Sequence, residues 1–347
     1  MRQRIDNIVF ELTQACNQRC RFCYNYWRDG SPLPSPDKSL CRRTLRRLLS
    51  QAEVRTISFS GGEPMCVPDV ADLALYCRFR GVSVNILSNG TLMTQTDILN
   101  FREIGVGAVQ VPVLSADAAV HEYLTGLPGS WKKATGTLAR VSELMPGKAY
   151  AVLVITRINA PDVTGTLELI GSLGVKSVMV NRFNIGGLGL RNRDELVLDK
   201  AGLQKAFSDV DAFAARHPEM FFMSGVCIPM CVLDSRQFPH IRFSYCSTDF
   251  NLRPVTVDYS GNVRFCNHSP KVLGNIYRSR IGEILSSPEA VSYYSSIPQF
   301  CMGCPDLKPC NGGCRAASEQ VYGNFSEPDP LLEVLEKGAA GPVPWDY

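Results

Sequence analysis

The sequence lacks long hydrophobic runs. Residues 1–16, MRQRIDNIVFELTQAC, contain no apolar stretch of signal-peptide length, and no later window reaches the about 18 apolar residues of a membrane span. A strong net charge is lacking too, because the formal charge is only +3 at pH 7. We therefore expect a cytoplasmic protein that binds neither membrane nor nucleic acid. One denser basic run alternates around more than one face of a helix and predicts a solvated helix: Arg42, Arg43, Arg46 and Arg47.

Internal repeats are also lacking, and the composition leaves no room for extensive disorder. Hydrophobic residues make up 45% and charged residues 20% of the 347 residues, which is ordinary for a packed globular enzyme. A chain of this length is too long for one small core. We expect one large α/β domain and one smaller unit.

The first 185 residues alternate β-rich runs with amphipathic helical segments, the pattern of repeated βα units around a parallel sheet. Six units close a sheet only partly, whereas a full barrel has eight strands. The loops at the carboxyl ends of the strands are expected to form the site. Strands are predicted at 7–13, 56–60, 82–88, 108–114, 149–156 and 177–183. Helices are predicted at 44–53, 70–80, 96–105, 131–144 and 162–174.

The rest of the chain is less regular. Residues 186–245 contain one predicted helix, at 200–217, and are interpreted as a bridge. In residues 246–330 short strands and turns predominate, so a small cluster-binding domain is expected there. Residues 331–347 predict a surface tail, in which Trp345 and Tyr347 are candidates for docking.

Fourteen cysteines stand out against this background. In a reducing compartment disulfides are rare, so dense and regularly spaced cysteines indicate metal ligands or redox groups. Three of them lie in residues 16–23 and six in 246–314, which predicts two metal-binding regions. The others lie between these clusters: Cys41, Cys66, Cys77, Cys227 and Cys231.

The first cluster, CNQRCRFC, follows the first predicted strand. A tetrahedral structural zinc site needs four ligands, and neither histidine nor cysteine follows close after Cys23, since Cys41 lies inside a predicted helix. An iron-sulfur cluster held by Cys16, Cys20 and Cys23 instead keeps one iron open for a further ligand. Spacing alone leaves a zinc site or a redox thiol trio as alternatives.

A second motif, SFSGGEP, follows the second predicted strand and is expected to face the same cavity. Gly61 and Gly62 allow the backbone to approach a ligand closely, and Glu63 offers an acceptor for an ammonium group. Together, CNQRCRFC and GGEP resemble the radical S-adenosylmethionine (radical SAM) enzymes. The resemblance implies that the three cysteines bind a [4Fe-4S] cluster, whose fourth iron is chelated by the amino and carboxylate groups of S-adenosylmethionine.

Two further strand ends match the segments with which this family contacts its cofactor, and a third departs from the family's pattern. ILSNGTL ends the third predicted strand and ITRIN ends the fifth. At the fourth, relatives often read SLDG, whereas this chain has VLSAD. The alternative for each position is a buried polar strand end. The residues implied as cofactor binders are Ser88, Asn89, Ser115, Arg157 and Asn159.

The second cysteine cluster forms an ordered frame. A single CxxC pair is weak evidence, because zinc ribbons use it as well. The whole set, however, resembles the SPASM extension of radical SAM enzymes, which usually carries two auxiliary iron-sulfur clusters. The resemblance implies one cluster on Cys301, Cys304 and Cys310, and another on Cys246, Cys266 and Cys314.

The match to this extension breaks near its end. Relatives commonly supply a seventh cysteine where this chain has Leu331 and Leu332, so each auxiliary cluster has three evident ligands. A carboxylate, a bridge cysteine, a substrate atom or nothing completes each set. His268, two residues past Cys266, is interpreted as a support and not as a ligand. The protein candidates for the fourth positions are Asp306, Asp329, Cys227 and Cys231.

The implied reaction is reductive cleavage of S-adenosylmethionine, after which a 5′-deoxyadenosyl radical takes a hydrogen atom from an unactivated C–H bond. The protein's share is to hold the target and exclude water. Relatives with this architecture mostly modify ribosomally made peptides by crosslinking, excision or other C–H chemistry, so we expect a peptide maturase. The alternatives are a small-molecule enzyme of tetrapyrrole or redox-cofactor biosynthesis, and a non-catalytic iron-sulfur or zinc protein.

The expected partners follow from this reading. Many peptide maturases begin with a recognition domain of ~80 residues, whereas the first predicted strand here begins at residue 7. We therefore expect a separate recognition protein to present the precursor peptide, or the barrel edge and bridge to bind it. An electron donor such as flavodoxin or ferredoxin is also expected. No catalytic acid or base is assigned, and four residues near the motifs are interpreted as structural: Asp117, Glu122, Tyr123 and Tyr259.

Overall fold

The computed structural model describes residues 2–29, 37–247 and 253–335. Within these ranges one sheet of 11 strands has the order β11-β10-β9-β1-β2-β3-β4-β5-β6-β7-β8. The last part of the predicted tail, with Trp345 and Tyr347, lies outside the described residues. In the described parts of the chain, no helix is long and apolar enough to cross a membrane.

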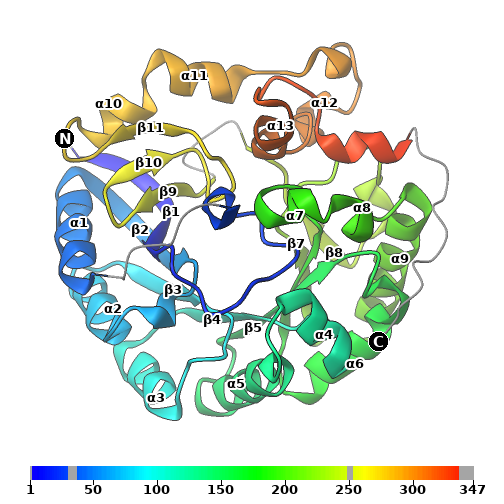
Figure 1. Ribbon diagram of the computed structural model, residues 1–347, viewed down its shortest axis with the longest axis horizontal. Coiled ribbons are helices and arrows are strands. Elements are labelled where there is room, and N and C mark those ends of the chain that lie inside the picture. The colour runs from blue at the N-terminus through cyan, green and yellow to red at the C-terminus, as the bar shows by residue number, and fades with distance from the viewer. Residues whose placement is uncertain (1, 30–36, 248–252, 336–347) are drawn as a thin grey trace.

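Strands β1 to β8 run parallel and lie side by side in chain order, as the repeated βα pattern predicts. The sheet curves into a ring in which β8 is not paired with β1, so the predicted partial barrel is confirmed (Figure 1). The bounds are β1 (Gln3–Thr13), β2 (Ala52–Gly61), β3 (Ser83–Leu87), β4 (Ala108–Pro112), β5 (Ala149–Ile155), β6 (Ser177–Arg182), β7 (Phe221–Ser224) and β8 (Ile241–Phe243).

Helices form the outer layer of the ring (Figure 1). In the first of them, leucines such as Leu45 and Leu48 are buried, and the four arginines of the basic run are exposed, as predicted. Its predicted end at residue 53 is wrong, because Ala52 already pairs with Gln3 of β1. The helices of this layer are α1 (Lys38–Gln51), α2 (Val70–Arg78), α3 (Gln95–Ile104), α5 (Ser130–Leu144), α6 (Val163–Ser172) and α9 (Lys200–Arg216).

The bridge continues the sheet. Its predicted helix is present as α9, but β7 and β8 on either side of the following loop were not predicted from the sequence. Both strands are short, and in β7 only Phe222 and Ser224 are buried, so the alternation is too brief to be recognised. Three small helices lie along one side of the opening of the ring in Figure 1: α4 (Ala118–Thr125), α7 (Gly187–Arg191) and α8 (Arg193–Leu196).

The C-terminal unit attaches to the other side of β1. Strand β9 (Val255–Asp258) pairs with β1 in parallel, and β10 (Asn262–Arg264) and β11 (Val272–Asn275) follow in antiparallel order. Its helices lie along one side of the ring (Figure 1). They are α10 (Ile281–Leu285), α11 (Pro288–Ser295), α12 (Leu307–Cys310) and α13 (Arg315–Tyr322).

A buried ion pair fastens this unit to the barrel. Arg264 on β10 donates to the carboxylate of Glu11 on β1, and the two side chains are only 1% and 2% exposed. The Arg264 guanidinium also lies 5.3 Å and 5.2 Å from the ring centroids of Tyr26 and Trp27. The first strand, the segment after the cysteine loop and the C-terminal strands therefore pack as one body.

Candidate active site and iron-sulfur centres

The cysteine loop, residues 16–23, leaves the ring directly after β1 and is held by the end of β2. Gly62 N donates to Thr13 O at 2.8 Å. A Cβ atom on Gly61 would lie 2.1 Å from Thr13 O, and one on Gly62 would lie 2.1 Å from Ala15 O. The two glycines of the GGEP motif are therefore required for its contact with the chain that leads into the cysteine loop.

Glu63 joins the ends of β2 and β3. Its carboxylate accepts from Ser88 Oγ at 2.7 Å, from Asn89 N at 2.6 Å and from Met65 N at 3.0 Å. The pKa of Glu63 is raised above its ordinary value, because the effect of burial outweighs the lowering by these hydrogen bonds. With an exposed fraction of 0%, the carboxylate orients Ser88 and Asn89 from inside the protein. Three of its about four acceptor positions are occupied in this way.

Asn89 reaches the cysteine loop from the end of β3. Its Nδ2 lies 3.9 Å from Cys16 Sγ and donates to Asn17 Oδ1 at 2.8 Å, while its Oδ1 accepts from Thr91 N at 2.9 Å. Gln18 N lies 3.4 Å from Cys16 Sγ as a second donor. N–H groups around a sulfur suit a thiolate that binds iron, since such hydrogen bonds tune iron-sulfur clusters. The structure thus brings this predicted binder to the first predicted ligand.

Asn159 has its hydrogen bonds inside the fold. Its Oδ1 accepts from Thr156 N at 2.7 Å and from Thr156 Oγ1 at 2.9 Å. Its Nδ2 donates to Leu114 O at 2.7 Å and to Val154 O at 2.9 Å. An amide side chain has two donor and two acceptor positions, so all of them are used to tie together the ends of β4 and β5.

Ser115 and Arg157, the other two predicted binders, also contact the protein itself. Ser115 is 3% exposed, and its Oγ accepts from Asp117 N at 3.1 Å. Arg157 donates through Nε and Nη2 to Val197 O at 3.1 Å and 2.8 Å. These contacts fix the backbone after β4 and β5. Unlike the contacts of Asn89, they do not involve the cysteine loop.

Helix α4, which the sequence analysis did not predict, supports the cysteine loop. Arg21 N donates to Leu124 O at 2.8 Å, and Arg19 N donates to Thr125 O at 3.1 Å. The last carbonyls of a helix have no partner within the helix. The backbone of the loop satisfies two of them, so α4 and the loop fix each other's position.

The sequence does contain signals for α4. Asp117 accepts from the backbone at the start of the helix, and Gly126 follows its last residue with φ 64°, which are a helix N-cap and C-cap. Tyr123 donates to Glu195 of α8, and the Arg21 guanidinium lies 4.0 Å from the Tyr123 ring centroid. Asp117 and Tyr123 therefore make contacts within the fold.

His121 of α4 gives a testable pH dependence. It is fully buried, and its Nδ1 accepts from Leu114 N at 3.2 Å. Burial lowers the pKa of His121 from 6.5 to about 4. Between these values the unfolded chain binds a proton and the folded chain does not, so stability is lost as the pH falls through this window.

We expect wild type to lose about 2 kcal/mol more of its unfolding free energy between pH 7 and pH 5 than His121→Asn loses. The asparagine retains an acceptor for Leu114 N and does not titrate. Urea unfolding of both proteins at both pH values measures the difference. Equal losses in the two proteins would show that His121 is not the group responsible.

The far end of the cysteine loop contacts the bridge and the C-terminal unit. Gly189 N of α7 donates to Cys23 O at 3.1 Å. Gln320 of α13 donates through Nε2 to Tyr24 O at 3.0 Å and to His268 O at 2.7 Å. Hydrogen bonds to the main chain of the loop and of the residue after it therefore hold it in place without using its thiols.

Cys246, Cys266 and Cys314, which the resemblance assigns to one auxiliary cluster, lie in one group in the structure. Cys314 Sγ lies 3.6 Å from His268 Nδ1 and 3.8 Å from Asn184 Nδ2. His268 is thus placed against a predicted ligand, where a supporting residue is expected.

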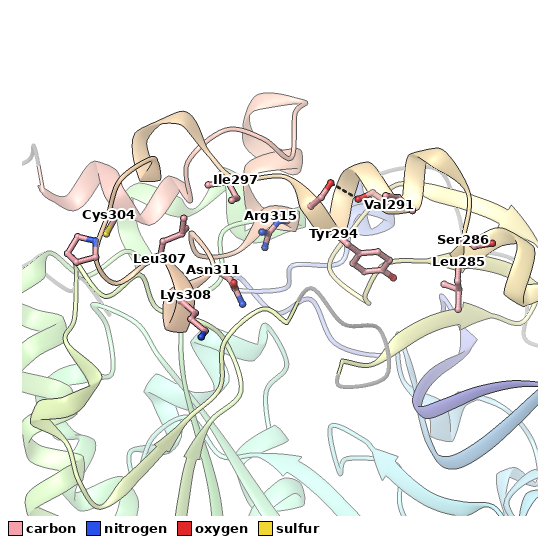
Figure 2. A pocket seen from close by; sticks show the side chains of 12 residues that line it. Leu285, Ser286, Val291, Tyr294, Ile297, Cys304, Leu307, Lys308, Asn311 and Arg315 are labelled. Atoms are coloured by element: carbon pink, nitrogen blue, oxygen red, sulfur yellow. Dashed lines mark hydrogen bonds between the residues drawn. The ribbon is translucent and has the colours of Figure 1, made fainter.

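Cys301, Cys304 and Cys310, the other predicted set, also lie near one another. The Cys301 thiol is within electrostatic reach of both other thiols. Cys304 lines a cavity of about 870 Å³ between the α10–α11 pair and the α12–α13 pair, together with Tyr294 and Arg315 (Figure 2). Of this predicted set, Cys304 is therefore exposed at the cavity, whereas Cys310 is buried.

The donor groups fit iron-sulfur clusters. In residues 2–29, 37–247 and 253–335, no group of three or more His, Cys, Asp or Glu side chains is arranged to hold a single metal ion. The predicted cysteine ligands fall into three sets, and an iron-sulfur cluster distributes its thiolate ligands over several irons. The chemistry of these groups suits one cluster at the opening of the ring and clusters in the C-terminal unit.

Comparison with known proteins identifies the two parts of the chain. The model of the radical SAM superfamily matches residues 10–170, and the SPASM model, an iron-sulfur cluster-binding domain, matches residues 246–305. Relatives include the PqqA peptide cyclase of Methylorubrum extorquens (strain PA1), 26% identical over 363 residues that cover 98% of this chain and 90% of the relative. The PqqA peptide cyclase of Streptomyces rochei is 26% identical over 358 residues, 97% of this chain and 94% of the relative.

Solved structures show the same fold. Native anSMEcpe with bound AdoMet and Cp18Cys peptide has a TM-score of 0.69 at 13% identity, over 96% of this chain and 95% of that chain. Streptococcus suis SuiB has a TM-score of 0.72 at 16% identity, over 94% of this chain and 76% of that chain. With its N-terminal cysteine loop, its partial barrel and its C-terminal cysteine groups, the chain belongs to the radical SAM enzymes that carry a SPASM domain.

Proposed function

We propose that this enzyme modifies a ribosomally synthesised precursor peptide. The observation that supports this most is the likeness to enzymes named PqqA peptide cyclase, which covers 97% of the chain or more. Solved structures with this fold include anSMEcpe with the Cp18Cys peptide and SuiB bound to the precursor peptide SuiA. The proposal covers crosslinking, excision and other C–H modifications of a peptide.

The residues at the opening of the ring have different roles in this reaction. Cys16, Cys20 and Cys23 hold the [4Fe-4S] cluster, and the ends of β2 and β3 bind S-adenosylmethionine. When bound, this pair supplies the 5′-deoxyadenosyl radical that removes a hydrogen atom from the peptide. Glu63 keeps the Ser88–Asn89 turn oriented toward the cysteine loop, and the polar residues that end β4 and β5 keep the neighbouring strand ends in place.

Gly62→Ala is expected to slow the formation of 5′-deoxyadenosine by about 10²-fold or more, because a displacement of about 1 Å has this effect in a positioned site. The new Cβ would lie 2.1 Å from Ala15 O and must push the cysteine loop away. Gly136→Ala in α5 is the matched control, since the atom nearest to its new Cβ is 3.7 Å away. Similar rates for both variants would contradict this role of Gly62.

We also propose the remaining partners. A flavodoxin or ferredoxin supplies the electron for reductive cleavage. A separate recognition protein presents the peptide, or the barrel edge and the bridge bind it directly. Whether a recognition protein copurifies with the enzyme distinguishes these two modes of binding. The enzyme is purified for this from the cytoplasm, the location expected from the sequence.

Co-expression with short peptides encoded beside this chain tests the proposed function. Wild-type enzyme is expected to change the mass of one such peptide, and fragmentation locates the new bond or the lost atoms. The Cys20→Ala variant, co-expressed in the same way, should leave the peptide unchanged. The proposal fails if every neighbouring peptide stays unmodified while the enzyme consumes S-adenosylmethionine with a tetrapyrrole or another small molecule.

A further inference from the structure

A short segment of the bridge lies against both cysteine groups of the C-terminal unit. Residues 227–231, CIPMC, follow β7 and carry a buried cysteine at one end and an exposed cysteine at the other. The proline between them packs against the GGC stretch, since a Cβ atom on Gly313 would lie 3.0 Å from Pro229 Cγ. Gly313 lies in the sequence between Cys310 of one group and Cys314 of the other, so Pro229 places the segment beside both groups.

Cys227 lies within the first group. It is 7% exposed and packs together with Cys246, Cys266 and Cys314. The thiols of Cys227 and Cys314 lie close enough to interact with each other. This group therefore contains four thiols, one more than the SPASM pattern assigns to it.

A buried ion pair fixes the backbone of two members of this group. Arg182 Nε donates to Cys227 O at 2.9 Å, and Arg182 Nη2 lies 2.6 Å from Asp329 Oδ2. The same Asp329 oxygen accepts from Cys314 N at 2.8 Å, and its Oδ1 accepts from Leu331 N at 2.9 Å. Asp329, a candidate ligand from the sequence, is thus occupied in positioning the segments that carry Cys227 and Cys314.

Cys231 lies near the second group. Its thiol is within electrostatic reach of the thiols of Cys310 and Cys304. The Cys301 thiol in turn interacts with Cys231 as well as with the other two. Asp306, the carboxylate candidate for this group, accepts a hydrogen bond from Arg236 at 3.3 Å. A fourth thiol is therefore present here too.

We propose that Cys227 and Cys231 are the fourth ligands of the two auxiliary clusters, of which the missing seventh cysteine of the SPASM pattern would have supplied only one. Each cluster is then bound by four cysteines, and residues 227–231 carry one ligand of each. A cluster with four thiolates has no open iron for a substrate atom. The auxiliary clusters therefore serve electron transfer or structure, and do not bind the substrate directly. This holds whatever the substrate is, and so goes beyond the proposed function.

The test uses reconstituted full-length enzyme in which the three cysteines of the loop are alanine, so that only the auxiliary clusters contribute iron and EPR signals. Cys227→Ala is expected to alter the same signal as Cys246→Ala, and Cys231→Ala the same signal as Cys304→Ala, each with a loss of about one to four irons per chain. Cys77→Ala, in the buried face of α2, is the control and should keep the parent's iron and spectrum. A bridge variant that also keeps them overturns the assignment of that cysteine.

A second measurement needs no variant and guards against misfolding. Cys231 is exposed in the protein chain, so its thiol is accessible to iodoacetamide unless it is bound to iron. In the reconstituted wild-type enzyme Cys231 is expected to resist alkylation as Cys304 does, and to react once a chelator has removed the iron. Equal labelling of Cys231 with and without the clusters would overturn its assignment as a ligand.

Discussion

Cys20→Ala is expected to abolish cleavage of S-adenosylmethionine while the chain stays folded and keeps its auxiliary clusters. Without Cys20 the first cluster has only two protein ligands. The loop itself stays in place, because β2, α4 and α7 hold its ends through backbone hydrogen bonds. Iron should fall from about twelve to about eight per chain, and 5′-deoxyadenosine should fall to the level found without enzyme.

The control for this variant is Cys77→Ala, which removes a buried thiol far from the loop in the sequence. It should retain both the iron content and the cleavage activity of the wild type. If Cys20→Ala still forms 5′-deoxyadenosine at a rate comparable with Cys77→Ala, Cys20 does not bind the cluster on which the reaction depends.

The second large effect is expected at the buried pair of Glu11 and Arg264, where the two single variants should differ. Glu11→Met leaves a buried guanidinium that cannot lose its charge, and this should lower the unfolding free energy by about 3–5 kcal/mol. Arg264→Met leaves a carboxyl group instead. Burial raises the pKa of Glu11 to about 7 even though the Arg264 charge lowers it, so this carboxyl takes up a proton and the loss is smaller.

The sign of the pH dependence follows from that difference. In Arg264→Met the folded chain holds the Glu11 proton more tightly than the unfolded chain, whose pKa lies near the ordinary 4.5. The variant should therefore be more stable at pH 5 than at pH 7.5, relative to wild type.

Urea unfolding of the single variants and of Glu11→Met/Arg264→Met measures these effects, and the double variant should be less destabilised than Glu11→Met. Lys205→Ala, in an exposed pair with Asp209, is the control with an expected cost below about 1 kcal/mol. An equally small cost for Glu11→Met would disprove the role assigned to the pair.

The main parts of the fold were predictable because their signals are local. Strands such as 149–156 are continuous apolar runs, and helices such as α9 show a clear apolar face, so the sequence alone places them. Strands β7 and β8 have four and three residues. They become strands by pairing with β6 and with each other, which is a tertiary effect that no short window of sequence contains.

The candidate site was predictable to the extent that a motif carries it. The spacing of CNQRCRFC predicts the first three ligands, but nothing local reports that Arg21 contacts Glu195, 174 residues away. The contacts of Asn159 could not be predicted locally either, because its side chain donates to carbonyl groups at the ends of two different strands. Cys227 and Cys231 belong to no spacing pattern with the C-terminal cysteines, and only the folded chain brings them there.

The pairing of β1 with β9 has a consequence for how the protein is made. Ile8 lies beside Val255, so this contact closes most of the chain into one loop, and such non-local pairing slows folding. During synthesis the first strand keeps an open edge, exposed to association with other chains, until the C-terminal unit has left the ribosome. The free edge of the strand that leads into the cysteine loop is thus covered late, and we expect the first cluster to be assembled only after the C-terminal unit has been synthesised.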